Sequence, residues 1–551
     1  QQTFDFAKSQ MGSAQEIALR LTPLKDVYYT HDTTFDFNPK GHRETNYVLL
    51  GIAFLILFIA GINFTNLTTS LIPLRLKTIN THRVLGCSIY KLRAISLIES
   101  IVICLISYIL ALFIVNDLSY TPIANWVDAD IRLSQYKGLI LLTALIAILT
   151  GCLAGLYPAI RSTSYAPALV LKGSFGLSPK GKKVRVALIG FQYTVSIALI
   201  IVTLFMGLQN HFMTSSEQLG FNKDQVAIVN LTPEIYAKHK PQYIQKLKDY
   251  PGIEDVAFSV YELSKEDDMI DLEYARHEDK DVFFKVFYAS ENFLSVMDIQ
   301  VEEGRDFTRE DLNKAQSDYI INPAAERDFH LHPGDRFNDR TVLGVSKDFR
   351  FNSCRIASSP FVFALNNDIP NPKLVSYIRF NSKTNLQEAV AHVRETLKEI
   401  DPTFPFEISF YNTILNNLYQ KEQTLGKLIS LFGIMAILIS IVGVFGLVLF
   451  ETQYRRKEIG IRKINGATIG QILLMFNKTY IRIVSVCFII SIPIAWMGTQ
   501  QWLENFAYKT PLHLWVFIVA FLIILSVTIG TVTFRNWQAA NENPVNSVKS
   551  E

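Results

Sequence analysis

The stretch RRKEIGIRKINGAT, residues 455–468, indicates how the chain is organised, because a related stretch, RLKTINTHRVLGCS, occupies residues 75–88. The two stretches align without a gap, 380 positions apart. Their shared basic and glycine positions are Arg75/Arg455, Lys77/Lys457, Arg83/Lys463 and Gly86/Gly466. Each copy follows one long apolar segment and precedes another. We interpret the pair as a duplicated membrane unit, with chance similarity between short basic loops as the alternative.

The composition is typical of a membrane protein, with 49% hydrophobic and 19% charged residues. Seven apolar segments are long enough to cross a bilayer as helices, which takes about 20 residues each. They are residues 47–71, 89–115, 138–160, 184–208, 428–450, 472–496 and 514–534. The sequence therefore predicts an α-helical polytopic membrane protein.

Loop charges predict the orientation, because cytoplasmic loops carry an excess of Lys and Arg. Residues 161–185 contain six basic residues and no acidic one, whereas residues 116–136 contain three Asp and one Arg. The basic loops, including both copies of the repeated stretch, are therefore predicted to face the cytoplasm. That assignment places residues 1–46 and 209–427 outside and the C-terminus inside.

A chain whose first residues lie outside the membrane needs a signal peptide or a preceding membrane helix to bring them across. Residues 1–10 contain no initiator Met, and no basic run followed by an apolar one. We expect that a first helix and most of a first external domain precede Gln1, with a cleaved signal peptide as the alternative. A restored first helix would make the two halves alike and give eight helices in the full-length protein.

The predicted domain organisation follows from these segments. It comprises residues 1–46 as the end of a first external domain, 47–171 as a three-helix membrane unit, 172–183 as a polar cytoplasmic linker, 184–208 as the helix that opens the second half, 209–427 as an external domain and 428–551 as a second three-helix unit. The external domain is long enough for its own core. Strand-like runs at 226–231, 282–288, 341–345 and 375–380, with helical patterns at 241–250 and 386–400, predict a mixed α+β fold.

Signals for catalysis or cofactor binding are few. His330 and His332 flank a single residue, but no matching ligand cluster is evident, so a solvated loop is favoured over a metal site. The stretch GLSPKGKK, residues 176–183, nearly fits a phosphate-binding loop, but Lys183 stands where the magnesium-binding Ser or Thr belongs. We interpret it as a basic anchor at the inner leaflet. We therefore expect no catalytic residue, cofactor or metal, and an energy source that lies in a partner.

Cysteine usage fits this layout. Cys354 is the lone cysteine in the predicted external domain, and Cys87 lies in a predicted cytoplasmic loop. The other three, Cys104, Cys152 and Cys487, fall within the apolar segments. A single external cysteine cannot form a disulfide within the chain, so the external domain must be held by its core.

Several stretches together resemble FtsX-like ABC-transporter permeases with a MacB-type periplasmic core domain. The two signatures are INFTNLTTSLIPLRLKTINTHRVLGC at 62–87 and the stretch at 455–468; the supporting stretches are YPAIRSTSYAPALVLKG at 157–173, LGFNKDQV at 219–226, GVSKDFRF at 344–351, DPTFPFEISF at 401–410 and NENPVNSVKS at 541–550. The likeness spans nearly the whole chain and is closest to the long, duplicated permeases of Bacteroidetes-type bacteria. It implies a multi-pass protein of the bacterial inner membrane with eight helices in full length.

The resemblance also implies partners and a mechanism. It implies a cytoplasmic ABC ATPase, in two copies per full-length chain, and conformational transmission to the periplasm without a substrate path through the helices. A periplasmic adaptor, an outer-membrane factor and membrane lipids are further expected partners, whereas nucleic acid is not. The expected function is export or extraction of a periplasmic substrate. The alternatives are a non-transporting regulator of a cell-wall hydrolase or sensor, and a passive membrane-anchored receptor.

The resemblance assigns contact with the ATPase to the repeated stretch. The candidate coupling residues are Arg455, Arg456, Lys457, Glu458, Arg462, Lys463 and Gly466 in the second copy, and Arg75, Lys77, Arg83 and Gly86 in the first. A turn held by lipid phosphates is the alternative.

Local chemistry predicts that the second copy is a rigid bent element. Glu458 and Arg462 have the i, i+4 spacing of a helical ion pair, and Gly466 can end that helix in a left-handed conformation. Thr468 and Gln471 can then form a capping box for the next helix. In the first copy Thr78 and His82 replace the ion pair, so we expect this copy to hold the ATPase less firmly.

Overall fold

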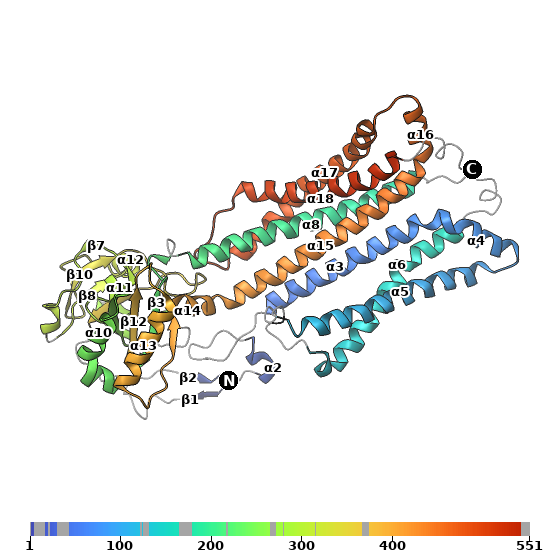
Figure 1. Ribbon diagram of the computed structural model, residues 1–551. Coiled ribbons are helices and arrows are strands. Elements are labelled where there is room, and N and C mark those ends of the chain that lie inside the picture. Colours follow the sequence, from blue (N-terminus) through green and yellow to red (C-terminus); the bar gives the residue numbers. More distant parts are fainter. Residues whose placement is uncertain are drawn as a thin grey trace. The chain divides into compact units, whose positions relative to one another are not determined.

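The computed structural model describes residues 2–4, 17–19, 23–29, 43–121, 124, 132–164, 179–215, 219–264, 271–278, 280–314, 316–365 and 374–541. Within these residues seven helices are long and apolar enough to cross a membrane (Figure 1). They are α3 (Arg43–Ser70), α5 (Ile89–Leu118), α6 (Lys137–Thr163), α8 (Pro179–Thr214), α15 (Gln420–Tyr454), α17 (Ile469–Leu503) and α18 (Leu514–Asn541). Each contains one of the seven predicted apolar segments, except that α3 stops one residue short of its segment.

Two of these helices extend well beyond their predicted segments. α8 begins at Pro179, inside the predicted linker, and a proline at the first helical position is compatible with its fixed backbone angle. Residues 179–183, the part of the GLSPKGKK stretch that the structure describes, are therefore helical. At the other end, α8 runs to Thr214 and α15 begins at Gln420, so both helices continue past their apolar residues. These polar turns lie in close contact. A Cβ added at Gly426 of α15 would lie only 2.9 Å from the side-chain amide nitrogen of Asn210 in α8.

The second half is a bundle of α8, α15, α17 and α18, which run side by side in Figure 1. Its interior is a continuous apolar cluster that includes Ile197, Phe205, Val484 and Ala520. Short polar side chains link the helices within it. Ser196 and Ser440 hydroxyls lie 2.9 Å apart, and the Thr528 hydroxyl lies 3.0 Å from that of Tyr193. Small polar contacts of this kind bring membrane helices together where lipid supplies no hydrophobic driving force.

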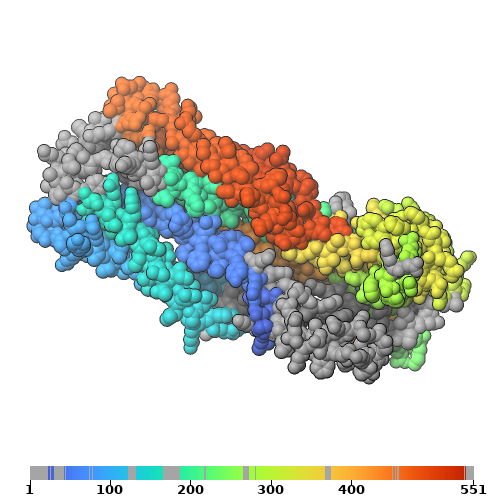
Figure 2. All heavy atoms as spheres, turned by 180° about the vertical axis from the view of Figure 1, so that it is seen from behind, coloured from blue at the N-terminus to red at the C-terminus, as the bar shows by residue number. Residues whose placement is uncertain are grey.

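α5 and α6 pack closely on each other in the first half. A Cβ at Gly155 of α6 would lie 2.5 Å from the Ser100 Cβ of α5, so this close approach requires glycine. Figure 2 shows the two helices, blue to cyan, at one face of the molecule. Large apolar side chains such as Ile98 and Phe113 of α5 are exposed along them. Exposed apolar side chains on long helices suit a hydrocarbon surround.

Residues 1–60 form a compact unit of their own, and residues 61–551 form the other. The described part of the first unit contains an antiparallel pair of strands, β1 (Gln2–Phe4) and β2 (Ile17–Leu19), and the short helix α2 (Leu24–Val27). α3 begins in this unit.

Between α8 and α15 lies a mixed α+β domain, called here the sheet domain, as predicted from sequence. Its described residues include eleven strands in one sheet, in the order β13-β3-β12-β4-β6-β11-β8-β10-β7, with β5 beside β6 and β9 beside β10. The strands are β3 (Val226–Leu231), β4 (Ile253–Ser259), β5 (Asp271–His277), β6 (Lys280–Ala289), β7 (Val301–Gly304), β8 (Tyr319–Ile321), β9 (Arg336–Phe337), β10 (Arg340–Ser346), β11 (Phe361–Leu365), β12 (Leu374–Phe380) and β13 (Ile408–Phe410). All four predicted strand runs are confirmed.

Helices cover this sheet. They are η3 (Ile235–His239), α10 (Lys240–Lys248), α11 (Phe293–Met297), α12 (Pro323–Phe329), α13 (Leu386–Ile400) and α14 (Tyr411–Leu418), with short turns η4 (Asp311–Asn313) here and η2 (Leu133–Gln135) before α6. Both predicted helical patterns, those of α10 and α13, are confirmed.

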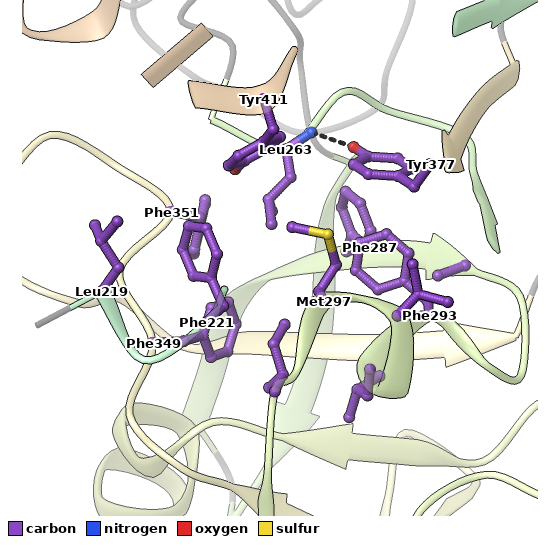
Figure 3. Packing of buried hydrophobic residues seen from close by; sticks show 14 of the residues in the cluster. Leu219, Phe221, Leu263, Phe287, Phe293, Met297, Phe349, Phe351, Tyr377 and Tyr411 are labelled. Carbon is purple, nitrogen blue, oxygen red and sulfur yellow. Dashed lines mark hydrogen bonds between the residues drawn. The ribbon is translucent and has the colours of Figure 1, made fainter. Parts of the chain in front are cut away.

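The largest apolar cluster of the sheet domain reaches the ends of the long helices. Figure 3 shows Phe349 and Phe351 beside Phe221, with Leu263 held by a hydrogen bond to the Tyr377 hydroxyl. The same cluster includes Met213 of α8, Tyr419 next to α15 and Phe506 from the α17–α18 connection. The sheet domain is therefore continuous with the second bundle through packed side chains.

Candidate functional site

The two repeated stretches fold into equivalent elements. We call residues 72–88 the first basic element and residues 455–468 the second basic element. Each contains a short helix, α4 (Ile72–Val84) or α16 (Arg456–Ile464), followed by a tight turn and the capped start of a long helix. Residues 81–90 and 461–470 are exposed, half-buried or buried in the same order at all ten aligned positions. This agreement in three dimensions favours duplication over chance.

The turn that ends each helix is built in the same way. Gly86 and Gly466 have φ angles of +92° and +88°, in the region that favours glycine. The next backbone N–H then closes back onto the helix, from Cys87 to the His82 carbonyl and from Ala467 to the Arg462 carbonyl, each at 2.9 Å. This is the closure of a Schellman motif, and the predicted role of Gly466 is confirmed.

The following helix is capped by a hydroxyl in both halves. Ser88 accepts a hydrogen bond from the Lys91 backbone N–H at the start of α5. Thr468 accepts from the Gln471 N–H, and the Gln471 side chain accepts from the Thr468 N–H at 3.1 Å. The predicted capping box is therefore confirmed, and both elements are bends closed by backbone hydrogen bonds.

Ion pairs differ between the two elements. In the second, Glu458 pairs with Arg462 at 2.9 Å, as predicted, and Arg455 pairs with Glu451 of α15 at 2.9 Å. In the first, Thr78 and His82 are exposed, and Arg75 instead reaches Glu99 of α5 at 2.8 Å. The second element is thus tied to the helix before it, and the first to the helix after it. The side chains of Lys77, Arg456 and Lys457 lie outside what the structure describes.

One aligned pair of basic residues binds the end of the third helix in each half. Arg83 donates to the Thr163 carbonyl at the C-terminus of α6 at 3.3 Å, and Lys463 donates to the Ala540 carbonyl near the C-terminus of α18 at 2.6 Å. Carbonyls at helix C-termini lack intrahelical partners and carry partial negative charge, which suits a cation. Arg83 and Lys463 therefore clamp each basic element to its own half.

Each basic element also presents an apolar residue to its surroundings. Val84 and Ile464 occupy aligned positions and are 67% and 65% exposed. On the inward side, Leu76 and Ile459 are buried. Each element thus has one face packed against the protein and one solvent-exposed face, which carries charged side chains and one exposed apolar residue, the apolar tip. Such a mixed surface suits docking of another protein.

A second group of contacts, which sequence reasoning missed, links the sheet domain to the long helices. We call it the joint; it consists of the contacts of residues 350–358 with the helix ends. The Arg350 guanidinium lies 4.1 Å from the ring centre of Tyr508 and 5.4 Å from that of Phe212. Arg355 pairs with Glu422 of α15 at 2.7 Å and lies over the Phe506 ring. Cations over aromatic rings and partly buried ion pairs hold such positions firmly.

Backbone hydrogen bonds complete the joint. The Tyr508 N–H donates to the Cys354 carbonyl at 3.1 Å, and the Ser358 N–H donates to the Tyr508 hydroxyl at 3.2 Å. The buried Gln209 side chain of α8 donates to the Tyr508 carbonyl at 3.0 Å and accepts from the Thr510 N–H at 2.8 Å. One loop of the sheet domain thus holds α8, α15 and the α17–α18 connection. The only signal in the sequence was the basic and aromatic run KDFRF at 347–351.

Four of the predicted cysteine positions now have a defined setting. Cys354 is buried, with its sulfur 3.2 Å from the Tyr419 hydroxyl, so it does not offer an exposed thiol. Cys104, Cys152 and Cys487 lie in α5, α6 and α17, as predicted from the apolar segments.

Comparison with known proteins supports this reading of the helical part. The family FtsX-like permease C-terminal matches twice, at residues 50–167 and 430–544, and each match contains one repeated stretch. The macrolide export ATP-binding/permease protein MacB of Aggregatibacter actinomycetemcomitans is 25% identical over 212 residues, which cover 36% of this chain and 32% of that protein.

Two solved structures are similar to part of the chain. The periplasmic region of MacB from Actinobacillus actinomycetemcomitans covers 36% of this chain and 94% of that one, at 14% identity and a TM-score of 0.27. The extracellular domain of the transporter YknZ from Gram-positive bacteria covers 33% and 99%, at 15% identity and a TM-score of 0.25. The two family matches identify an FtsX-like permease unit in each membrane half, and the chain is similar to MacB over about a third of the length of each protein.

Proposed function

We propose that this permease couples ATP hydrolysis by a separate cytoplasmic ABC ATPase to rearrangement of its sheet domain on the periplasmic side. The observation that supports the proposal best is the matched pair of basic elements. They share a turn, a cap, a clamp and an exposed apolar tip, yet they lie in different halves of the chain. Two docking surfaces built on the same plan suit two copies of one partner.

The proposed orientation rests on loop charge. Both basic elements lie in loops predicted to be cytoplasmic, so the C-terminus is cytoplasmic and the sheet domain is periplasmic. The seven apolar helices make the chain a multi-pass protein of the inner membrane.

A continuous set of contacts can carry motion from the second basic element to the sheet domain. Arg455 binds Glu451 of α15, and Glu451 in turn accepts a hydrogen bond from the Tyr480 hydroxyl of α17 at 3.2 Å. A push on this element therefore acts on α15 and α17 together. At their far ends, α15 reaches the joint through Glu422, and the α17–α18 connection reaches it through Tyr508.

The expected output is export or extraction of a periplasmic substrate. A periplasmic adaptor and an outer-membrane factor are the partners that would complete such a path. Activation of a cell-wall hydrolase or a sensor would use the same motion, with nothing transported.

Site-specific photo-crosslinking tests the docking surfaces. A photo-reactive p-benzoylphenylalanine at position 464 or 84 should crosslink the ATPase in native membranes, because both positions are exposed tips. Matched controls are positions 514 and 120, which are 73% and 78% exposed and lie at the opposite helix ends. Crosslinks to an ATPase from all four positions, or from none, would contradict the proposal.

A further inference from the structure

Three side chains from three different elements of the sheet domain converge outside the residues that form the joint and the basic elements. Glu303 lies on β7, Glu326 on α12 and His332 in the turn that follows α12. Each offers one ligand atom, and these atoms all lie within 4.8 Å of one another. The histidine that sequence reasoning left as a solvated loop residue thus does have ligand-type neighbours, which become visible only in the fold.

The turn that carries His332 is fixed by its backbone. His330 ends α12 in a left-handed conformation, with a φ of 53°, and the buried Leu331 anchors the turn to the core. The His332 N–H donates to the Asp335 carboxylate at 2.7 Å, and the Gly334 N–H donates to the Val342 carbonyl at 2.8 Å. The backbone of His332 is therefore fixed by the fold, in a position from which its imidazole reaches the carboxylates.

The strand that carries Glu303 is held equally closely. Gly304 has a φ of +79°, and a Cβ there would lie 2.2 Å from the Leu343 carbonyl oxygen of β10. Glu303 pairs in register with Val345 of β10. β7 is thus fixed against β10, and the Gly334–Val342 hydrogen bond ties the turn after α12 to the same strand. The backbones that carry Glu303 and His332 are therefore placed before any ion binds.

The charge balance of this cluster favours a cation. The His332 Nδ1 lies 3.5 Å from a Glu326 carboxylate oxygen. Within the described residues, no Lys or Arg forms an ion pair with Glu303 or Glu326, so two carboxylates approach each other without a fixed positive charge. One imidazole nitrogen and two carboxylate oxygens form a ligand set typical of Zn²⁺ and related transition metals, whereas Ca²⁺ and Mg²⁺ prefer oxygen alone.

We propose that Glu303, Glu326 and His332 bind one divalent transition-metal ion, with Zn²⁺ as the best chemical fit, on the surface of the sheet domain. Three protein ligands leave a coordination position for water or for a group from another molecule. A bound ion would fasten the edge strand β7 to α12. The site is independent of ATPase docking, so its failure would leave the proposed function unchanged.

Metal titration of the purified full chain tests this site. After treatment with EDTA and dialysis, Zn²⁺ is titrated against a chromogenic chelator, and Co²⁺ is added separately to read its visible absorption spectrum. We expect one equivalent of tight binding. His332→Ala and Glu326→Gln should each lower the affinity by about tenfold or more, because each removes a ligand that the fold has already placed.

His330→Asn is the matched control, because it removes a neighbouring exposed histidine while Asn tolerates the left-handed backbone. It should bind Zn²⁺ like the parent chain. Thermal unfolding without metal should be similar for all variants, since the His332 side chain is largely exposed and the half-buried Glu326 keeps its shape as Gln. Unchanged affinity in His332→Ala and Glu326→Gln, or equal competition by Ca²⁺, would overturn the proposal.

Discussion

At the scale of single residues, the clamp positions show what sequence comparison cannot assign. Arg83 and Lys463 align in the repeat, and the family resemblance groups them with the residues that contact the ATPase. In the fold each donates to a carbonyl at the end of the third helix of its own half. Their alignment was readable from the sequence, but their acceptors lie 80 and 77 positions away along the chain. No local pattern points to a backbone carbonyl at that separation.

Loss of the Lys463 clamp should loosen the second basic element. In Lys463→Met a charged hydrogen bond is lost, which should cost about 1.5–3 kcal/mol locally. Amide hydrogen exchange of residues 456–467 should accelerate, while membrane insertion stays normal. Arg462→Met is the control, since its exposed pair with Glu458 contributes only about 0.3–0.5 kcal/mol. Equal exchange in the two variants would show that the clamp does not hold the element.

Cys354 should report on the joint. Burial raises the pKa of its thiol, and both its carbonyl and its sulfur are engaged, so an impermeant thiol reagent should label Cys354 of the native protein very slowly. Tyr508→Ala removes the ring under Arg350 and the acceptor for the Ser358 N–H, and should increase the labelling rate. Tyr480→Ala, in the bundle away from the joint, is the control. Rapid labelling of the parent chain would mean that the joint is open.

At the scale of elements, the strength of local patterns decided which parts of the sheet domain were predictable. β3 and α13 have the predicted bounds, because β3 is a buried apolar run and α13 is strongly amphipathic after its Asn385 cap. β8 has only three residues, and β11 is an apolar run whose five residues are all buried. Neither shows a period that separates a strand from a helix. Their pairing with β10 and β6 is set by contacts distant in sequence.

One turn of the sheet domain should make its stability depend on pH. Asp311 accepts two hydrogen bonds from Arg305, at 2.7 and 2.9 Å, and others from the Thr308 backbone and hydroxyl. The Arg305 guanidinium holds the pKa of this carboxyl far below its ordinary value. The resulting stability is present above the unfolded pKa of about 3.9 and is lost as the pH falls below it.

Asp311→Asn should therefore lower the stability of the sheet domain by about 2 kcal/mol at pH 7 and by progressively less as the solution is acidified below pH of about 4. Thermal unfolding of the parent and the variant between neutral and acidic pH measures this difference. Glu310→Gln, the exposed neighbour, is the control. A difference between parent and variant that stays constant on acidification would show that the Asp311 charge contributes nothing.

At the scale of the whole molecule, the sequence predicted the repeated unit, the seven helices and a mixed domain between α8 and α15. Those features depend on apolar length and on internal similarity, which are local. The joint could not be predicted, because it brings together residues near positions 209, 350, 422 and 508. For the same reason, the sequence could not tell which basic residues bind a helix end, as Arg83 and Lys463 do, and which face outward.

The two halves are unequal in a way that bears on coupling. The second basic element carries the Glu458–Arg462 pair on its open face, whereas the first has Thr78 and His82 at those positions. The second bundle is also the half that packs into the sheet domain through Met213 and Phe506. We therefore expect the second half to hold the ATPase more firmly and to carry more of the motion.

Retention of the ATPase on the affinity-purified chain tests the central claim most directly. The double swap Glu458→Arg with Arg462→Glu keeps an internal pair, though in the less favourable helical order, and inverts the charge pattern that the element presents. We predict that it lowers the amount of ATPase that co-purifies at equal expression, with normal membrane insertion. The parallel change Thr78→Arg with His82→Glu should lower it less. Equal retention by both double variants and the parent chain would mean that the basic elements are turns held by lipid, and would contradict the account.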